Sequence, residues 1–175
     1  MTTLRYLLLC LCLLFPAVGS SDTFQEPEEF VSEVFAGNPP KPTVLWITDA
    51  IRPGIEQIMG RDLGVLRLRY WGEPGRTVWI LEETGKEQPI TTGIVVVHNK
   101  VELVKVLIYR ESRGFEVRQA FFTDQFKGAG LKEDQELDHT IDGISGATLS
   151  TRALTKLARL ALYLHQHSEF TDVPG

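Results

Sequence analysis

The sequence predicts an α+β domain in which an antiparallel β-meander of about four strands packs against a long C-terminal helix and short helices. Segments between residues 66 and 110 have the pattern of strands, and no helix separates them. The segment from Thr148 to about His167 has the spacing of an amphipathic helix. The composition, with 43% hydrophobic and 23% charged residues in a chain of 175, is that of an ordinary globular domain.

The meander is predicted from alternation and from turn residues. The predicted strands are 66–70, 77–81, 90–98 and 101–110. In the first strand, apolar residues alternate with Arg67 and Arg69, which indicates one buried and one exposed face. The stretch 72–75 is a turn, and a hairpin joins the last two strands at Asn99-Lys100.

The predicted helices flank this meander. Residues 27–36 and 53–59 each have a proline in the first turn and a glycine just beyond the last, which is typical of short helices. A stiff, proline-rich linker, 38–42, follows the first of them. Three phenylalanines, Phe121, Phe122 and Phe126, indicate a further short helix. The apolar face of the long helix is expected to consist of Leu149, Ala153, Leu157, Leu160, Ala161 and Leu164.

The first twenty residues have the layout of a secretory signal peptide. Arg5 precedes an apolar run of about 12 residues, which is shorter than the roughly 20 of a membrane span, and small residues follow it. Cleavage is therefore favoured over a retained anchor, and the protein is expected to be periplasmic or on the outer face of the cytoplasmic membrane. The predicted organisation is a signal peptide over 1–20, a helix and proline-rich linker over 21–50, and a functional domain over 51–170.

The composition also excludes several kinds of functional site. Both cysteines, Cys10 and Cys12, lie in the apolar run, so the mature chain has no thiol. His165 and His167 are two residues apart on a helix and point to different faces, so we predict no metal site. The sequence shows no pair of an acid and a base of the kind that forms a catalytic centre. We therefore assign no catalytic residue. A net charge of −5 argues against nucleic acid as a partner.

The segment from Asp142 to Ser150 stands out because it is a glycine-containing turn that opens the long helix. Taken structurally, it is a helix start in which Ser145 is the expected N-cap. Taken chemically, Thr148 offers a hydroxyl capable of attacking a phosphoryl centre, and Gly146 and Ala147 let another protein approach the backbone. A phosphate bonded there would lie at a helix N-terminus, which favours anions.

The pattern Asp-x-x-Ser-Gly-Ala-Thr in this segment resembles the flavinylation motif of the FMN-binding domain family. That family includes the extracytoplasmic FMN subunits of the sodium-pumping quinone reductase and of the Rnf complex. Three weaker matches occur in the family's order: 89–93, 111–114 (where serine replaces the usual threonine) and 126–128. The motif residues are Asp142, Gly143, Ser145, Gly146, Ala147 and Thr148.

The resemblance implies a fold, a cofactor and partners. It implies that a flavin transferase moves FMN from FAD onto Thr148, and that the cofactor is bound by Thr148, Ser145, Gly146, Ala147 and Glu111. It further implies an electron carrier that exchanges electrons with membrane or periplasmic redox proteins. Two alternatives stay open: a flavin-dependent reductase component, and a non-redox sensor or assembly factor with the same fold.

Several other residues are candidates for contact with a flavin. The aromatic residues Trp71, Trp79, Tyr70, Phe115 and Phe121 have faces suited to stacking on its ring, although such residues are more often core. Lys86 and Arg110 carry charges that suit an anionic reduced flavin, although each is more often a solvated surface charge.

Overall fold

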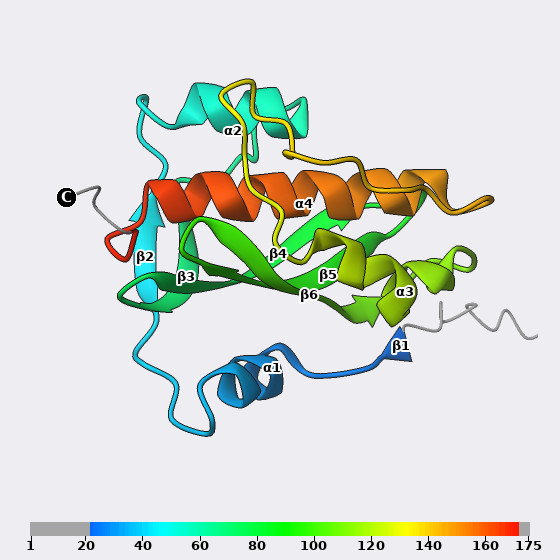
Figure 1. Ribbon diagram of the computed structural model, residues 1–175, viewed down its shortest axis with the longest axis horizontal. Helices are drawn as coiled ribbons and strands as arrows, with labels where there is room; N and C mark the ends of the chain where they lie inside the picture. The colour runs from blue at the N-terminus through cyan, green and yellow to red at the C-terminus, as the bar shows by residue number, and fades with distance from the viewer. Residues whose placement is uncertain (1–21, 172–175) are drawn as a thin grey trace, which may run out of the picture.

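A six-stranded antiparallel sheet forms the centre of the protein in the computed structural model, which describes residues 22–171 (Figure 1). The strands are β1 (Asp22–Thr23), β2 (Thr43–Trp46), β3 (Arg67–Glu73), β4 (Arg76–Thr84), β5 (Pro89–Val97) and β6 (Lys100–Tyr109). Their order in the sheet is β1-β6-β5-β4-β3-β2. The helices are α1 (Pro27–Val34), α2 (Arg52–Met59), α3 (Ala120–Thr123) and α4 (Thr148–Gln166), with 3-10 turns η1 (Phe115–Arg118) and η2 (Asp124–Phe126).

The predicted α+β class and the central meander β3-β4-β5-β6 are confirmed, but the sheet has six strands rather than about four. The two additional strands lie at its edges, with β1 beside β6 and β2 beside β3. Both are short, at two and four residues, so neither is long enough to display an alternating pattern that identifies a strand. The predicted signal peptide lies outside the described residues.

Local turn chemistry explains how the meander is connected. The β5–β6 hairpin turns through His98 and Asn99, which have positive φ values of 48° and 61°. Two consecutive residues of this kind match the right-handed twist of the flanking strands. The turn is therefore one residue earlier than predicted, and Lys100 already belongs to β6.

The elements form four layers, seen from top to bottom in Figure 1 as α2, α4, the sheet and α1. Helix α4 covers one face of the sheet, and α2 packs against the outer side of α4. There Gly54 lies against the Tyr163 ring, whose hydroxyl donates to the Ile51 carbonyl at 3.1 Å. On the opposite face, α1 buries Phe30 and Val31 against β4, β5 and β6.

The core between α4 and the sheet consists of apolar side chains and a small hydrogen-bonded group of polar atoms. Tyr70 and Trp79 stack with ring centroids 4.5 Å apart. The Trp79 indole N–H donates to the Thr77 hydroxyl at 2.9 Å, and His165 Nδ1 lies 2.8 Å from the same oxygen. These contacts connect the last turn of α4 to the beginning of β4.

The buried face of α4 is as predicted except in its first turn. Ala153, Leu157, Leu160, Ala161 and Leu164 are buried, whereas the side chain of Leu149 is 44% exposed. The small residues Ser150 and Thr151 form the buried side of the first turn instead. Among residues 22–171, no helix has the length and hydropathy needed to cross a membrane.

Candidate functional site

The conspicuous motif forms a turn that leads directly into α4. The Ala147 N–H donates to the Ile144 carbonyl at 3.0 Å, which closes the turn, and Gly146 has a φ of 84° that glycine adopts without strain. Ala147 is buried, whereas Thr148, the first residue of α4, is exposed. The threonine is therefore accessible on a backbone that is held in place.

The prediction that Ser145 caps α4 is wrong. Ala147 is the N-cap residue, and no side chain accepts a hydrogen bond from the first turn. The positive φ of Gly146 places Ser145 inside the preceding turn, two residues before the cap position. The first backbone bond into the helix is from the Thr151 N–H to the Ala147 carbonyl at 2.9 Å. The described residues thus provide no side-chain acceptor for the earlier N–H groups, which are the groups that bind anions at helix starts.

The end of β6 and the turn that follows it pack against the first turn of α4. The Tyr109 hydroxyl donates to the Arg113 carbonyl at 2.5 Å and lies 3.2 Å from the Ser150 hydroxyl. Burial, together with the nearby carboxylates of Glu111 and Glu116, raises the pKa of Tyr109 above its usual value. The phenol therefore stays neutral and acts as a fixed hydrogen-bonding group.

Gly114 shows how tightly the helix start fits. A Cβ at this position would lie 3.1 Å from the Ala147 Cβ and 3.0 Å from the Tyr109 hydroxyl, and its φ is 80°. A side chain here would push Ala147, and with it the motif, away from the sheet. The predicted segment 111–114 is thus brought against the motif by the fold.

Glu111 also lies beside the first turn of α4, where its carboxylate stabilises the β4–β5 turn. Its Oε1 accepts hydrogen bonds from the backbone N–H groups of Lys86, Glu87 (2.7 Å) and Gln88 (3.1 Å), which form the β4–β5 turn. A Cβ at Gly85 would lie 2.8 Å from this oxygen and 3.3 Å from the Ser150 hydroxyl. Glu111 therefore holds the β4–β5 turn next to the first turn of α4, and its contact with a cofactor stays a prediction.

Asp142 and Gly143 are exposed at the start of the motif. The Asp142 N–H donates to the side-chain oxygen of Gln125 at 2.7 Å, and the Gln125 carbonyl lies 2.8 Å from Nε2 of His139. The sequence did not single out Gln125, although it directly precedes the Phe126-Lys127-Gly128 match. Gln125 is the side chain that fixes the beginning of the motif.

A second anchor of this loop is Asp138. Its carboxylate contacts the Lys100 ammonium at 2.6 Å and accepts from the Gly130 N–H at 3.0 Å. These two donors, Lys100 foremost, hold the pKa of Asp138 well below its usual range. The loop before the motif is therefore fixed at both Asp138 and Asp142.

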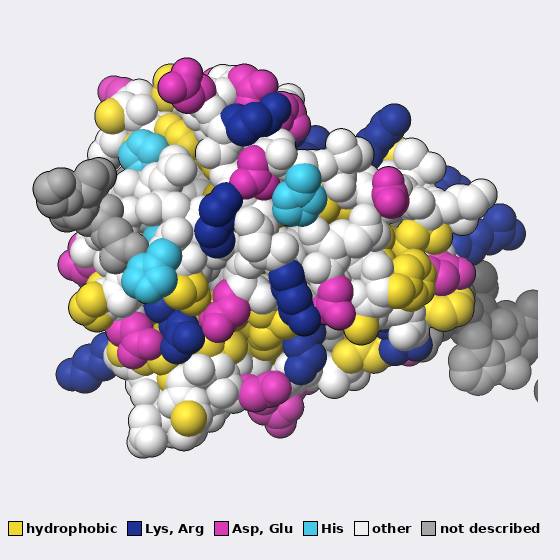
Figure 2. Space-filling view, viewed as in Figure 1, with side chains coloured by type: hydrophobic (Ala, Val, Ile, Leu, Met, Phe, Trp, Pro, Cys, Tyr) yellow, Lys and Arg dark blue, Asp and Glu magenta, His cyan; other side chains and the backbone are white. Residues whose placement is uncertain are grey.

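The aromatic candidates separate into two groups. Tyr70 and Trp79 are core residues, and Trp71 lies on the α1 face of the sheet. Phe115 and Phe121 are exposed, together with Phe24 and Leu149. We call these four the motif-end patch: Phe24, Phe115, Phe121 and Leu149. Figure 2 shows hydrophobic side chains gathered at the end of the molecule where α3 lies.

A cation accompanies this patch. The Arg118 guanidinium lies 4.3 Å from the ring centroid of Phe24 and 5.6 Å from that of Phe115. A Cβ at Gly114 would lie 3.1 Å from the Ala147 Cβ, and η1 begins directly after Gly114. Phe115 and Arg118 therefore both lie on the turn that adjoins the start of α4. Arg110, by contrast, donates to the Pro89 carbonyl and the Thr91 hydroxyl and braces the sheet. Lys86 pairs with Glu87 at 3.1 Å.

Comparison with known families agrees with this geometry. Residues 85–163 match the model of the FMN-binding domain family, and this match supports a flavin-binding protein. The match includes the β4–β5 turn, Glu111, Gln125 and the motif up to Thr148. No curated protein matches the chain. Among residues 22–171, no group of three His, Cys, Asp or Glu side chains is placed to hold a metal ion.

Proposed function

We propose that the protein is an exported electron-transfer flavoprotein whose FMN is attached through a phosphoester to Thr148. The observation that carries this proposal is the exposed Thr148 hydroxyl at the start of a 19-residue helix whose first turn has no side-chain cap. The match of residues 85–163 to the FMN-binding domain family supports FMN as the cofactor.

The residues present fit a phosphate at this position. The uncapped N–H groups of the first turn supply donors, and the helix dipole favours a negative charge. Ser145, Gly146 and Ala147 supply the backbone of the adjoining turn. The Ser150 hydroxyl, held by Tyr109, completes the polar side of the first turn.

Attachment requires a partner enzyme, for which we propose a flavin transferase that uses FAD. The Thr148 oxygen attacks the FMN phosphorus of FAD, the bond between the two phosphates breaks, and AMP leaves. A base of the transferase takes the hydroxyl proton. The exposed Asp142 and the small Gly143 and Gly146 leave the motif open to such an enzyme.

The FMN ring supplies reversible acceptance of electrons. The chain's own contribution is the turn beside Thr148, where the exposed Phe115 ring offers a surface for stacking and Arg118 offers a positive charge. The exposed motif-end patch suits brief contact with a donor or acceptor, for which we propose membrane or periplasmic redox proteins. The signal peptide predicted from the sequence of residues 1–20 supports the proposal that this exchange occurs outside the cytoplasm.

The test is to produce the protein together with a flavin transferase and to measure its intact mass and visible absorbance. The unaltered chain is expected to gain the mass of one FMN less water and to be yellow. Thr148→Val should abolish both, because no hydroxyl remains. Thr140→Val, in the same loop, is the matched control and should be fully loaded. Retention of colour and mass in Thr148→Val would contradict attachment at this residue.

A further inference from the structure

The meander opens into a cleft between β3 and β4. These strands pair only from Glu73↔Arg76 to Tyr70↔Trp79, whereas β4 continues beside β5 as far as Thr84↔Pro89. The first half of β3 pairs with β2 alone. A hollow of about 790 Å³ lies on the α1 side of this opening, and one of about 440 Å³ lies on the α4 side. Leu68 and Ile80 line both, so the two hollows are the two sides of what we call the β3–β4 cleft.

Main-chain groups of β4 face into the cleft. In antiparallel pairs, residues alternate between bonding to one neighbour and facing the other. The bond from the Gly85 N–H to the Gln88 carbonyl (3.1 Å) fixes this alternation for β4 and β5. It follows that the N–H and C=O groups of Ile80, Glu82 and Thr84 point toward the cleft.

The first half of β3 presents a second row of main-chain groups. The bond from the Ile47 N–H to the Leu66 carbonyl (2.9 Å) fixes the alternation between β2 and β3. The N–H and C=O groups of Arg67 and Arg69 therefore point away from β2, toward the cleft. No strand of residues 22–171 lies between these two rows.

The side chains on the α1 side of the cleft are positively charged. Arg67 and Arg69 are exposed and line this hollow, and neither has a carboxylate partner among the described residues; Arg67 lies over the Trp46 ring at 5.7 Å. The carboxylates of the neighbouring strand are engaged elsewhere: Glu82 by Arg110 at 3.5 Å, and Glu83 by Arg61 at 2.7 Å and Lys156 at 3.5 Å. Among residues 22–171, Glu28 is the only carboxylate that lines this hollow, so the two arginines give its described lining a net positive charge.

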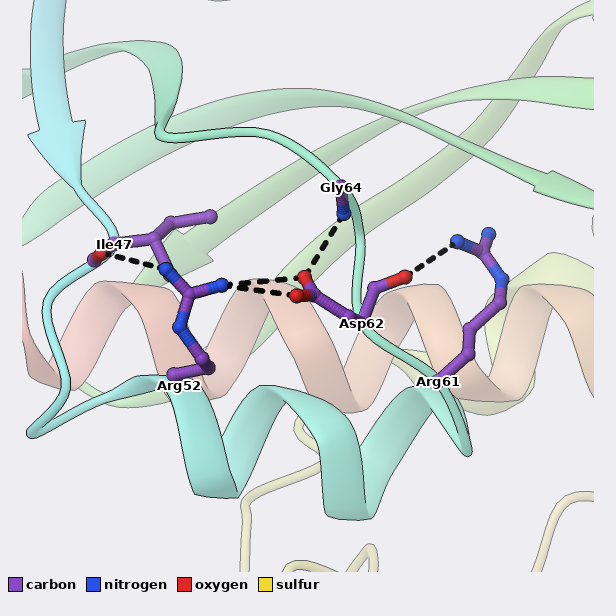
Figure 3. A network of polar contacts seen from close by, with 5 residues as sticks. All are labelled: Ile47, Arg52, Arg61, Asp62 and Gly64. Carbon is purple, nitrogen blue, oxygen red and sulfur yellow. Dashed lines mark hydrogen bonds and ion pairs between the residues drawn. The ribbon is translucent and has the colours of Figure 1, made fainter.

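The α4 side of the cleft is largely apolar. Its lining includes Leu63, Val65, Leu81 and Leu160. The loop that carries Leu63 and Val65 is held by Asp62, which accepts from Arg52 at 3.1 Å and from the Gly64 N–H at 2.9 Å (Figure 3). This wall is therefore preformed, which reduces the entropy lost when a ligand binds.

We infer that the β3–β4 cleft binds an extended polypeptide segment of a partner protein, in which acidic and apolar side chains alternate. An added strand would bond to the main-chain groups of Ile80, Glu82 and Thr84. Because side chains of a strand alternate between faces, every second one meets Arg67 and Arg69, and the others enter the apolar hollow. A second copy of this chain does not provide that pattern, since its free edge strand β2 reads Thr-Val-Leu-Trp. The inference does not depend on the flavin.

The test uses a fluorescein-labelled synthetic peptide of alternating Glu and Val, with anisotropy as the readout. Binding should be saturable, and a peptide of alternating Lys and Val should bind at least about tenfold more weakly, because like charges meet across the site. The Glu-Val peptide with N-methyl groups on alternate residues should also lose affinity, since it cannot form the main-chain bonds. Equal binding of all three peptides, or none at millimolar peptide, would overturn the inference.

Variants locate the site. Arg67→Gln combined with Arg69→Gln should weaken binding of the Glu-Val peptide about tenfold or more, whereas Arg113→Gln combined with Arg152→Gln, at the other end of the molecule, should not. Thr148→Val should bind as the unaltered chain does, so a failure of the flavin proposal leaves this test intact. Amide shifts in NMR spectra should centre on Ile80, Glu82 and Thr84; shifts centred on the motif would place the peptide elsewhere. Binding of anionic lipid vesicles or self-association through the same arginines, without peptide binding, would contradict a peptide partner.

Discussion

The two ends of the sheet use their polar groups in opposite ways. At the motif end, the polar side chains form hydrogen bonds with the backbone of neighbouring segments, as seen for Glu111, Tyr109 and Gln125. These bonds fix the segments around Thr148, which is itself exposed. At the β2–β3 end, the arginines and strand edges of the cleft have few partners within the described chain. Exposed large apolar side chains occur at both ends, with Val44, Trp46, Val65 and Leu66 at the second.

This difference separates the part of the chain that matches the FMN-binding domain family from the part that we propose binds a partner. The family match starts at residue 85, so it contains the motif and the residues that hold it in place, but not Phe24 and none of β2, β3 or β4. A frame that orients one hydroxyl must be rigid, whereas a surface that receives a partner must leave groups unpaired. Changes at the motif end should therefore cost stability or loading, and matched changes in the cleft should cost neither.

The largest effect on stability is expected from Glu111→Ala. It removes an acceptor of three backbone hydrogen bonds, and bonds to a charged group contribute about 1.5–3 kcal/mol, so the free energy of unfolding should fall by about 2 kcal/mol. Arg69→Ala, at the other end, should change it by less than about 0.5 kcal/mol. Urea denaturation of both variants measures the difference. Equal losses would remove the contrast between the two ends.

Gln125→Ala should act on the motif more than on the fold. Loss of one side-chain hydrogen bond costs about 1 kcal/mol, and the freed Asp142 segment should accept FMN roughly tenfold more slowly than the unaltered chain. The loading rate, followed by intact mass with a purified transferase and FAD, is the measurement. Gln119→Ala, an exposed glutamine nearby, serves as the control. An unchanged loading rate in Gln125→Ala would show that the anchor does not position the motif.

Arg118→Gln should lower the midpoint potential of the loaded protein, because a positive charge near the ring favours the anionic reduced flavin. An interaction of about 1 kcal/mol corresponds to about 20 mV for a two-electron couple. Spectroelectrochemical titration gives the potential, and Arg67→Gln in the cleft should leave it unchanged. A rise in potential on loss of Arg118 would contradict a place beside the flavin.

The smallest effect concerns Asp138. Its pKa is lower in the folded protein than in the unfolded chain, where a carboxyl of this kind titrates near 4. The stabilisation is therefore present above about pH 4 and is lost as the pH falls through the folded-state value. Asp138→Asn should destabilise the protein at pH 7 by a few tenths to about 1 kcal/mol, since the pair is partly exposed. The difference should shrink in acid denaturation measurements below pH 4. A constant difference across this range would exclude an ionic origin.

The sequence predicted those parts of the structure that periodicity determines. Strand β3 is identified by alternation, β4 by the turn before it, β5 and β6 by their long apolar runs, and helix α4 by its apolar face. Strand β2 was not predicted because its four residues, which follow a proline-rich linker, are too few to show an alternation of apolar and polar side chains. The Ser145 cap was wrong because the turn geometry depends on the φ of Gly146, and Gln125 escaped because its partner is 17 residues away. Contacts of this kind are set by tertiary structure and leave no local signal.

The most direct test of the central claim is to locate the flavin on the chain. Protein matured in a host that has the transferase should be digested with protease, and its yellow peptide sequenced by tandem mass spectrometry. The flavin-bearing peptide should contain residues 145–152, with the added mass of FMN less water on Thr148. A flavin found on another residue, or an unmodified Thr148 in protein that retains its colour after denaturation, would contradict the account.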